Sequence, residues 1–151
     1  MEHFFEDYLE RLQDLHQDFE KAITGLPQEA LDWVPGADMN SLVVLIVHTT
    51  GATRFWVGDM AAGDPAPRDR AAEFKAKGLS EAELKARLTT CEAYMRGALE
   101  RLTLADLAIV RTTPSGHEHS VSWSLLHAME HTGIHVGHAQ LNRQLWDQRQ
   151  A

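Results

Sequence analysis

The chain of 151 residues is 44% hydrophobic and 24% charged, which is typical of a globular protein, and we expect a single domain over residues 1–151. Its 14 lysine and arginine residues against 22 aspartate and glutamate residues give a formal net charge of −8, which argues against nucleic acid or an anionic membrane as the main partner. The single cysteine excludes an internal disulfide and, with no apolar run near roughly 20 residues long, predicts a cytoplasmic protein.

A first amphipathic helix is predicted from about Glu2 to Thr24, where Gly25 and Pro27 stop it. Its apolar residues recur at steps of three and four: Phe5, Tyr8, Leu9, Leu12, Leu15, Phe19 and Ile23. His16 lies near the edge of this stripe. We expect it to be half-buried and hydrogen-bonded to a neighbour; the alternative is a supporting position behind a metal ligand.

Residues 25–39 predict an irregular connection in which Trp33 folds back over the end of the molecule. The second helix should then begin at Asn40 or Ser41, since either side chain can cap it. Leu42 to Val47 alone could form a buried strand, but the helical spacing of apolar residues continues to Trp56 and favours a helix.

His48 falls midway along the apolar face of this second helix. A lone histidine there is usually a core residue with a satisfied hydrogen bond, unless another helix supplies further metal ligands.

Residues 60–79 predict a long loop with one helical turn near Arg70–Lys75, long enough to cross the end of a helical bundle. Its charged residues are expected to pair among themselves at the surface, and they are Arg68, Asp69, Arg70 and Glu73. The alternative is that an arginine of this group anchors an anionic ligand.

A capping box at Ser80–Glu83 opens a third helix, whose core positions follow at heptad-like spacing: Leu84, Leu88, Cys91, Met95, Ala98 and Leu102. Cys91 on this stripe is expected to be a small buried apolar residue rather than a ligand or nucleophile. Residues 103–119 predict another connection with a turn at Pro114 and Gly116, leaving His117 and His119 in solvent.

The last helix, Ser120–Asp147, contains four histidines and no proline. On a helix these histidines span an arc of about 80°, and they are His127, His131, His135 and His138. Apolar residues lie on or beside the same arc, so we expect the histidine stripe to face the interior; these are Trp123, Ile134, Leu141 and Leu145. Each buried imidazole then needs a partner, and a metal ion would satisfy several at once.

Two histidines four residues apart can converge on one ion, and a third from a facing helix would leave one coordination position open, as in catalytic sites. The spacing fits both His127/His131 and His131/His135 and does not decide between them. The alternative is a polar layer of hydrogen-bonded core histidines. Glu130 precedes a histidine, so the arrangement is not that of zincin proteases, but this carboxylate could serve in acid/base chemistry.

Four long helices, no convincing strand and no internal repeat predict an all-α four-helix bundle. Three features resemble the DinB-like superfamily of four-helix-bundle metalloproteins: His48 followed by Trp56, the R-D-R-x-x-E-F segment at residues 68–74, and the E-H-T-x-x-H-x-G-H run at residues 130–138.

The resemblance implies an up-down-down-up topology with a crossover between helices two and three. It also implies one divalent metal ion per chain, nickel or zinc, held by His48, His131 and His135, and a homodimer. His138 stands where many members have glutamine, so it is expected in the pocket. Some members transfer low-molecular-weight thiols.

The favoured hypothesis is a metal-dependent enzyme that activates such a thiol, as cosubstrate, for attack on a small electrophile. Glu130 and His138 would act as catalytic groups, with His127, Trp56 and His16 in the pocket or behind the ligands. The alternatives are a hydrolase in which metal-bound water supplies the nucleophile, and a non-enzymatic metal-binding stress module.

Overall fold

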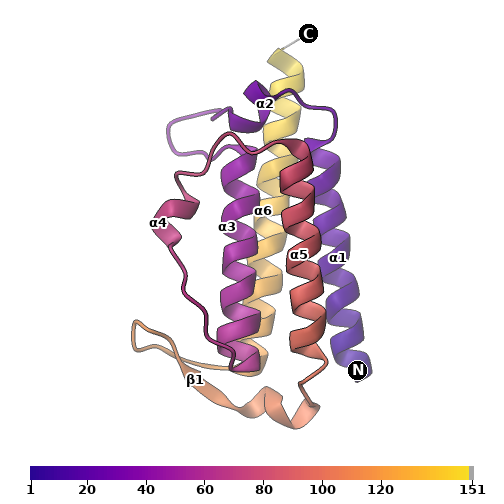
Figure 1. The fold of residues 1–151 in the computed structure, drawn as a ribbon, viewed down its shortest axis with the longest axis vertical. Coiled ribbons are helices and arrows are strands. Elements are labelled where there is room, and N and C mark those ends of the chain that lie inside the picture. Colours follow the sequence, from indigo (N-terminus) through magenta and orange to yellow (C-terminus); the bar gives the residue numbers. More distant parts are fainter. Residues whose placement is uncertain (150–151) are drawn as a thin grey trace.

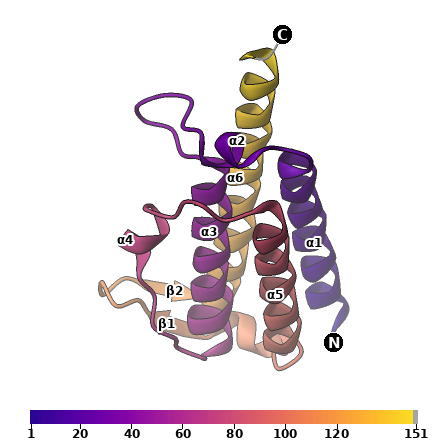
Figure 2. The same ribbon diagram turned by 45° about the horizontal axis from the view of Figure 1, so that its top comes forward.

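The computed structural model describes residues 1–149 and forms the expected four-helix bundle (Figure 1). Its long helices are α1 (His3–Ile23), α3 (Leu42–Thr53) with its π-helical continuation η1 (Arg54–Ala62), α5 (Glu81–Leu99) and α6 (Val121–Arg149). Helices α1 and α6 run in one direction and α3 and α5 in the other, so the predicted up-down-down-up topology is confirmed (Figures 1 and 2).

The connections are short elements at the ends and along one side of the bundle. They are α2 (Gln28–Asp32), α4 (Arg70–Glu73), the 3₁₀ turn η2 (Leu104–Ala108), β1 (Val110–Thr112) and β2 (Glu118–Ser120). Because α3 and α5 are parallel, the chain between them must return along the whole bundle. It does so outside α3 and carries α4 midway, as predicted for the crossover (Figure 1).

Capping fixes where two of the helices begin. The Ser41 hydroxyl accepts a hydrogen bond from the Val44 amide at 3.2 Å, and Ser80 and Glu83 form the predicted capping box. Every residue of α3 except Gly51 is buried, which explains its strand-like apolar composition: the helix is covered on all sides.

Two apolar clusters fill the bundle, one at each end, and a polar layer separates them. One cluster centres on Leu12 and Val57 and the other on Phe19 and Val47. Between them the helices bury polar side chains: His16, His48, Thr49, Thr50, Thr53 and Thr132. This layer places six buried polar side chains near the middle of the bundle. None of the helices within residues 1–149 combines the length and apolar character that crossing a bilayer requires.

The prediction that the histidine stripe of α6 faces the interior is wrong. Trp123, Ile134 and Leu141 are 41%, 51% and 45% exposed, and the buried residues of α6 are mostly small or polar: Val121, Ser124, Leu125, Ala128, Thr132, Val136, Ala139, Asn142 and Trp146. Small side chains let α6 lie close to its neighbours, and this contact sets its rotation. The stripe therefore lies at the edge of the buried face.

The prediction of no strand is also wrong, because β1 and β2 pair as a short antiparallel hairpin with Arg111 opposite His119. Strands of three residues leave too little periodicity to recognise in the sequence. His117 is exposed as predicted, whereas His119 is half-buried against Trp123. Trp33 packs on Trp146 at 5.5 Å, as expected for a residue folded over the bundle end.

Candidate metal centre

Three imidazoles from two helices meet at the edge of the polar layer. The Nε2 atom of His131 lies 3.1 Å from Nε2 of His48 and 3.1 Å from Nε2 of His135. One ring nitrogen from each of the three lies within 4.8 Å of the others, a spacing that could hold a metal ion. Of the two pairs that the spacing left open, the structure joins His131 and His135 with His48; His127 stays outside this group.

The hydrogen-bonding chemistry of this cluster fits a cation at its centre. His48 Nδ1 lies 2.9 Å from a carboxylate oxygen of Glu73, so Nδ1 donates its proton there and Nε2 keeps a lone pair. His131 Nε2 carries one proton at most. It can either donate a hydrogen bond to His48 Nε2 or accept one from His135 Nε2, but it cannot do both. The three nitrogens therefore present more lone pairs than protons, which is the arrangement a metal ion satisfies.

The three histidines are held in their neutral form. Burial, reinforced by the neighbouring imidazoles, lowers the pKa of His131 to about 3 and that of His135 to about 4. Burial also lowers the pKa of His48, although its hydrogen bond to Glu73 opposes the shift. Neutral imidazole is the form that coordinates metal, so the cluster is ready to bind without first losing protons.

The metal-free protein should lose stability as the pH falls. Unfolded histidine titrates near about pH 6.5, whereas His131 and His135 stay neutral in the folded state until about pH 3–4. The unfolded state therefore binds more protons below about pH 6.5, and the contribution present above that pH is lost on acidification. Urea midpoints of chelator-treated protein should fall from about pH 7.5 to about pH 5. They should fall less in a His131→Asn, His135→Asn variant; equal slopes would contradict this prediction.

Glu73 supports the cluster from the crossover. Its side chain is only 8% exposed and binds His48 through Oε2, while Arg68 donates to Oε1 from Nε at 2.7 Å and to Oε2 from its terminal nitrogen at 2.8 Å. Burial alone would raise the pKa of Glu73, but the hydrogen bonds from Arg68 and His48 hold this pKa below its usual value. A carboxylate behind a ligating histidine fixes its tautomer and orientation.

The prediction that the crossover charges pair among themselves at the surface is therefore wrong for Glu73, which is buried. The pairing with Arg68 is as expected. The location differs because α4 presses the carboxylate onto α3 at Gly51, where a Cβ atom would meet Glu73 Oε1 and lie 2.8 Å from its Cδ. On the same segment, the ring of Phe74 covers His48 with 4.5 Å between ring centres. The crossover thus closes one side of the cluster.

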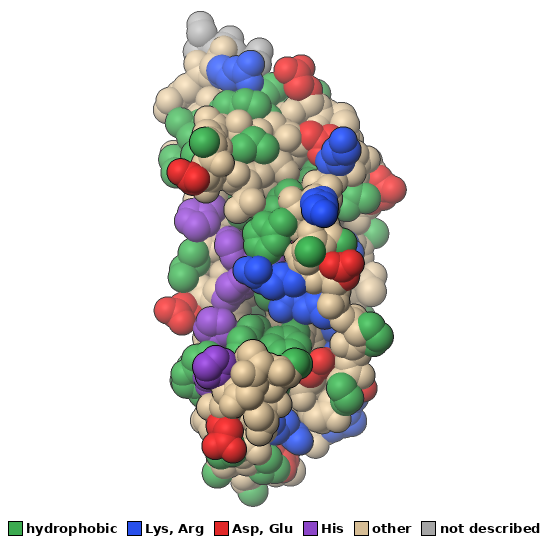
Figure 3. Space-filling view, turned by 90° about the vertical axis from the view of Figure 1, so that its left-hand side faces the viewer, with side chains coloured by type: hydrophobic (Ala, Val, Ile, Leu, Met, Phe, Trp, Pro, Cys, Tyr) green, Lys and Arg blue, Asp and Glu red, His purple; other side chains and the backbone are tan. Residues whose placement is uncertain are grey.

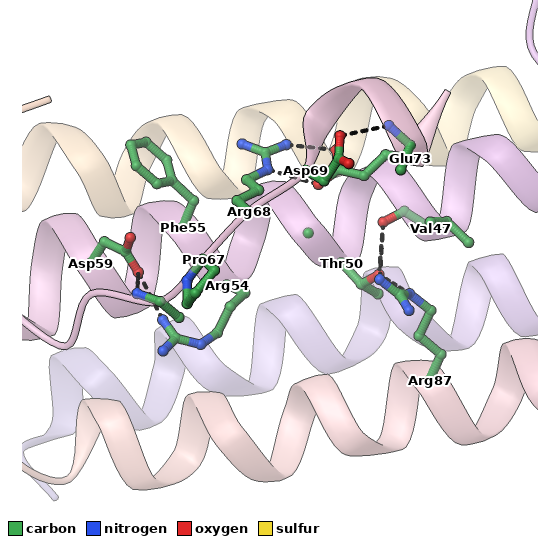
Figure 4. Close-up of a pocket in the computed structure, with 13 residues that line it drawn as sticks. Val47, Thr50, Arg54, Phe55, Asp59, Pro67, Arg68, Asp69, Glu73 and Arg87 are labelled. Atoms are coloured by element: carbon green, nitrogen blue, oxygen red, sulfur yellow. Dashed lines mark hydrogen bonds and ion pairs between the residues drawn. The ribbon is translucent and has the colours of Figure 1, made fainter. Parts of the chain in front are cut away.

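A cavity of about 370 Å³ lies behind Glu73, between α3, η1, the crossover and α5 (Figure 4). Its charged groups already have protein partners: Arg68 binds Glu73, Arg54 binds Asp59 at 2.9 Å, and Arg87 donates to the Thr50 hydroxyl at 2.6 Å. The three histidines do not line this cavity, and Glu73 lies between it and His48.

A second pocket lies beside His127 and the hairpin turn, and we call it the aromatic pocket. It has a volume of about 450 Å³ and is lined by Phe55, Trp56, His119, Trp123, His127 and the hairpin turn at Thr113, Pro114, Ser115 and His117. The ring of His127 lies 6.0 Å from that of His131. The predicted pocket residues Trp56 and His127 are therefore beside the cluster.

Other predicted residues lie farther out. The Glu130 carboxylate is 70% exposed and lies 3.9 Å from His127 Nδ1, and His138 is exposed with its ring 5.5 Å from that of His135. His16 is fully buried and bonds to Glu92 at 2.9 Å; among the described contacts, none joins it to the cluster.

The sequence did not assign Glu73, Phe74 or Trp123 to the cluster or its pocket, although all three lie there. The signal for the first two was the R-D-R-x-x-E-F segment itself, whose acidic and aromatic residues both reach His48.

On the surface, histidines form a column along one face, beside a cluster of basic side chains (Figure 3).

Comparison with known proteins supports this account of the fold. The sequence pattern of the DinB superfamily matches residues 11–139. No functionally curated protein matches the sequence significantly.

Similar solved structures include YfiT from Bacillus subtilis, described as a probable metal-dependent hydrolase with an unusual four-helix bundle topology. Its TM-score is 0.75 at 13% identity, over 95% of this chain and 88% of that one. A conserved protein from Enterococcus faecalis has a TM-score of 0.74 at 15% identity, over 93% of this chain and 95% of that one. A mutant of the mycothiol-dependent maleylpyruvate isomerase has a TM-score of 0.66 at 13% identity, over 88% of this chain and 59% of that one. At these identities the similarity establishes the fold.

Proposed function

This chain belongs to the DinB superfamily, and from that premise we propose that it is a metal-dependent enzyme whose divalent ion is held by His48, His131 and His135. The observation that supports this assignment is the convergence of three neutral imidazole nitrogens with too few protons among them. Three histidines leave a coordination position open for a reactant, which distinguishes catalytic from structural sites.

We propose more specifically that the reaction transfers a low-molecular-weight thiol to a small electrophile. When bound, the ion would supply Lewis acidity that lowers the pKa of a thiol or water beside it. Burial lowers the pKa of His127, so its imidazole is neutral and one of its ring nitrogens can accept the thiol proton; Nδ1 lies 3.9 Å from the Glu130 carboxylate. The mycothiol dependence of the structurally similar maleylpyruvate isomerase supports a thiol.

The remaining details of the proposal follow the family resemblance. Zinc and nickel both suit imidazole ligands and are the metals we propose. A homodimer is supported by exposed apolar side chains on the outer face of α6, Ile134 and Leu141, and light scattering would test it.

Replacing His135 with alanine is expected to lower thiol transfer by at least about 100-fold, because the site would lose one of its three ligands. The measurement is turnover of chlorodinitrobenzene with bacillithiol, mycothiol or glutathione by protein reconstituted with zinc or nickel. His3→Ala, at a histidine whose side chain is 99% exposed at the start of α1, is the control and should keep its metal and its activity. Undiminished transfer by a metal-free His135→Ala variant would overturn the proposal.

A hydrolase is the second candidate, and the description of YfiT as a probable metal-dependent hydrolase favours it. Metal-dependent turnover of nitrophenyl esters without added thiol would identify this reaction. If metal binds and neither reaction occurs, the chain is a non-enzymatic metal-binding module.

A further inference from the structure

Three rings from β2 and α6 form a parallel stack beside the metal cluster. The His119 and Trp123 rings lie 3.7 Å apart at 13°, and the Trp123 and His127 rings 4.8 Å apart at 11°. The three residues are spaced by four in the sequence, so α6 and the end of the hairpin place them in one column. Trp123 nevertheless remains 41% exposed, which is a large apolar exposure for a ring held in a stack.

Trp56 of η1 lies across this stack. Its ring is 5.6, 5.3 and 4.7 Å from those of His119, Trp123 and His127, at angles of 63–74°. With Phe55 and the turn at Pro114, these rings line the aromatic pocket of about 450 Å³, a volume within the usual range for small-molecule sites.

The chemistry of the walls selects the ligand. Among the described residues that line the pocket, none carries a carboxylate, an ammonium or a guanidinium group, so the lining offers no permanent charge to pair with an ionic group. Both faces of Trp123 are covered by imidazoles, so the part it leaves exposed is its edge. Ring edges carry partial positive charge and attract the face of another aromatic ring, while they repel a cation.

The pocket adjoins the metal cluster through His127, whose ring centre is 6.0 Å from that of His131. We infer that the aromatic pocket binds an uncharged aromatic ring of the substrate, so that the group attached to this ring faces the three histidines. That the ligand is a substrate rests on the proposed function. Binding of the aromatic ring itself does not require the metal.

The test uses naphthylmethanol as the probe and follows the four tryptophan indole N–H signals by NMR in zinc-reconstituted protein. Trp56 and Trp123 should shift saturably, and Trp33 and Trp146, which pack together at the other end of α6, should not. Replacing Trp123 with alanine should weaken binding about tenfold while the zinc content stays unchanged. Leu126→Ala, at a residue 64% exposed on the same helix, is the matched control and should bind normally.

Replacing zinc with cobalt tests whether the probe binds beside the metal. If it does, the cobalt ion should broaden the NMR signals of the bound probe. Binding of the saturated decahydro analogue or of naphthoate as strong as that of the probe would overturn the inference, as would unchanged affinity in Trp123→Ala. Zinc binding without shifts at Trp56 and Trp123 would refute the aromatic site alone. Shifts at both tryptophans in a protein that binds no metal would support the aromatic site and refute the proposed function.

Discussion

Replacing Glu73 with alanine is expected to lower the free energy of unfolding by about 3 kcal/mol, because removing one partner of a buried ion pair leaves the other uncompensated. The variant leaves the His48 Nδ1 proton and the Arg68 guanidinium without their acceptor. We take the lower end of the usual range because the Arg68 side chain is 21% exposed and regains some water. Urea unfolding of the metal-free protein measures the loss.

Two further variants separate the effect of the Glu73 charge from the effect of its burial on stability. Glu73→Gln keeps the shape of the side chain and one acceptor oxygen, so it should be more stable than Glu73→Ala and still bind metal more weakly than the wild-type protein. Asp147→Ala removes an exposed partner of Arg143 and should change stability by no more than about 0.5 kcal/mol. Equal stability of Glu73→Ala and Asp147→Ala would contradict the buried role of Glu73.

Replacing Gly51 with alanine is expected to weaken metal binding by about 10–100-fold, the effect typical of losing the partner behind a ligating histidine. A Cβ atom at this position would meet the Glu73 carboxylate, which three hydrogen bonds hold in place. The carboxylate must then move away from His48. We also expect a loss of about 1–3 kcal/mol in stability from overpacking. Zinc affinity by competition with a chromogenic chelator and urea unfolding check both effects.

Gly97 provides the matched control, because it also lies within a helix and a Cβ atom there would have nothing within 4 Å. Alanine at this position should be neutral or stabilise the protein by up to about 1 kcal/mol, as usual for glycine in a helix. If Gly51→Ala is as stable as Gly97→Ala and keeps full metal affinity, then the crossover does not hold Glu73 against His48.

The sequence predicted the bundle well because its long helices carry strong periodicity and clear caps, as at Ser41 and at Ser80. It placed four histidines within one arc of the last helix but did not determine whether that arc faces the interior of the bundle. The rotation of α6 depends on small buried residues such as Ala128 and Thr132, which carry little weight in an apolar pattern. The choice between the two histidine pairs depends on the same rotation, so spacing alone left it open.

Glu73 and the aromatic pocket were harder to predict for a different reason. The burial of Glu73 depends on a four-residue helix meeting Gly51 from another part of the chain, a contact that no local pattern encodes. The position of His119 over Trp123 likewise depends on the register of a hairpin whose strands have three residues each. Both features arise from tertiary contacts between segments with weak local preferences.

The most direct test of the central claim is elemental analysis of protein purified without chelator or metal-affinity resin, for the wild type and for His135→Ala. We predict about one zinc, nickel or similar ion per wild-type chain and none in the variant, since three converging imidazoles form the site. A wild-type protein that holds no metal, even after reconstitution, would show that His48, His131 and His135 form only a hydrogen-bonded layer and would contradict the account.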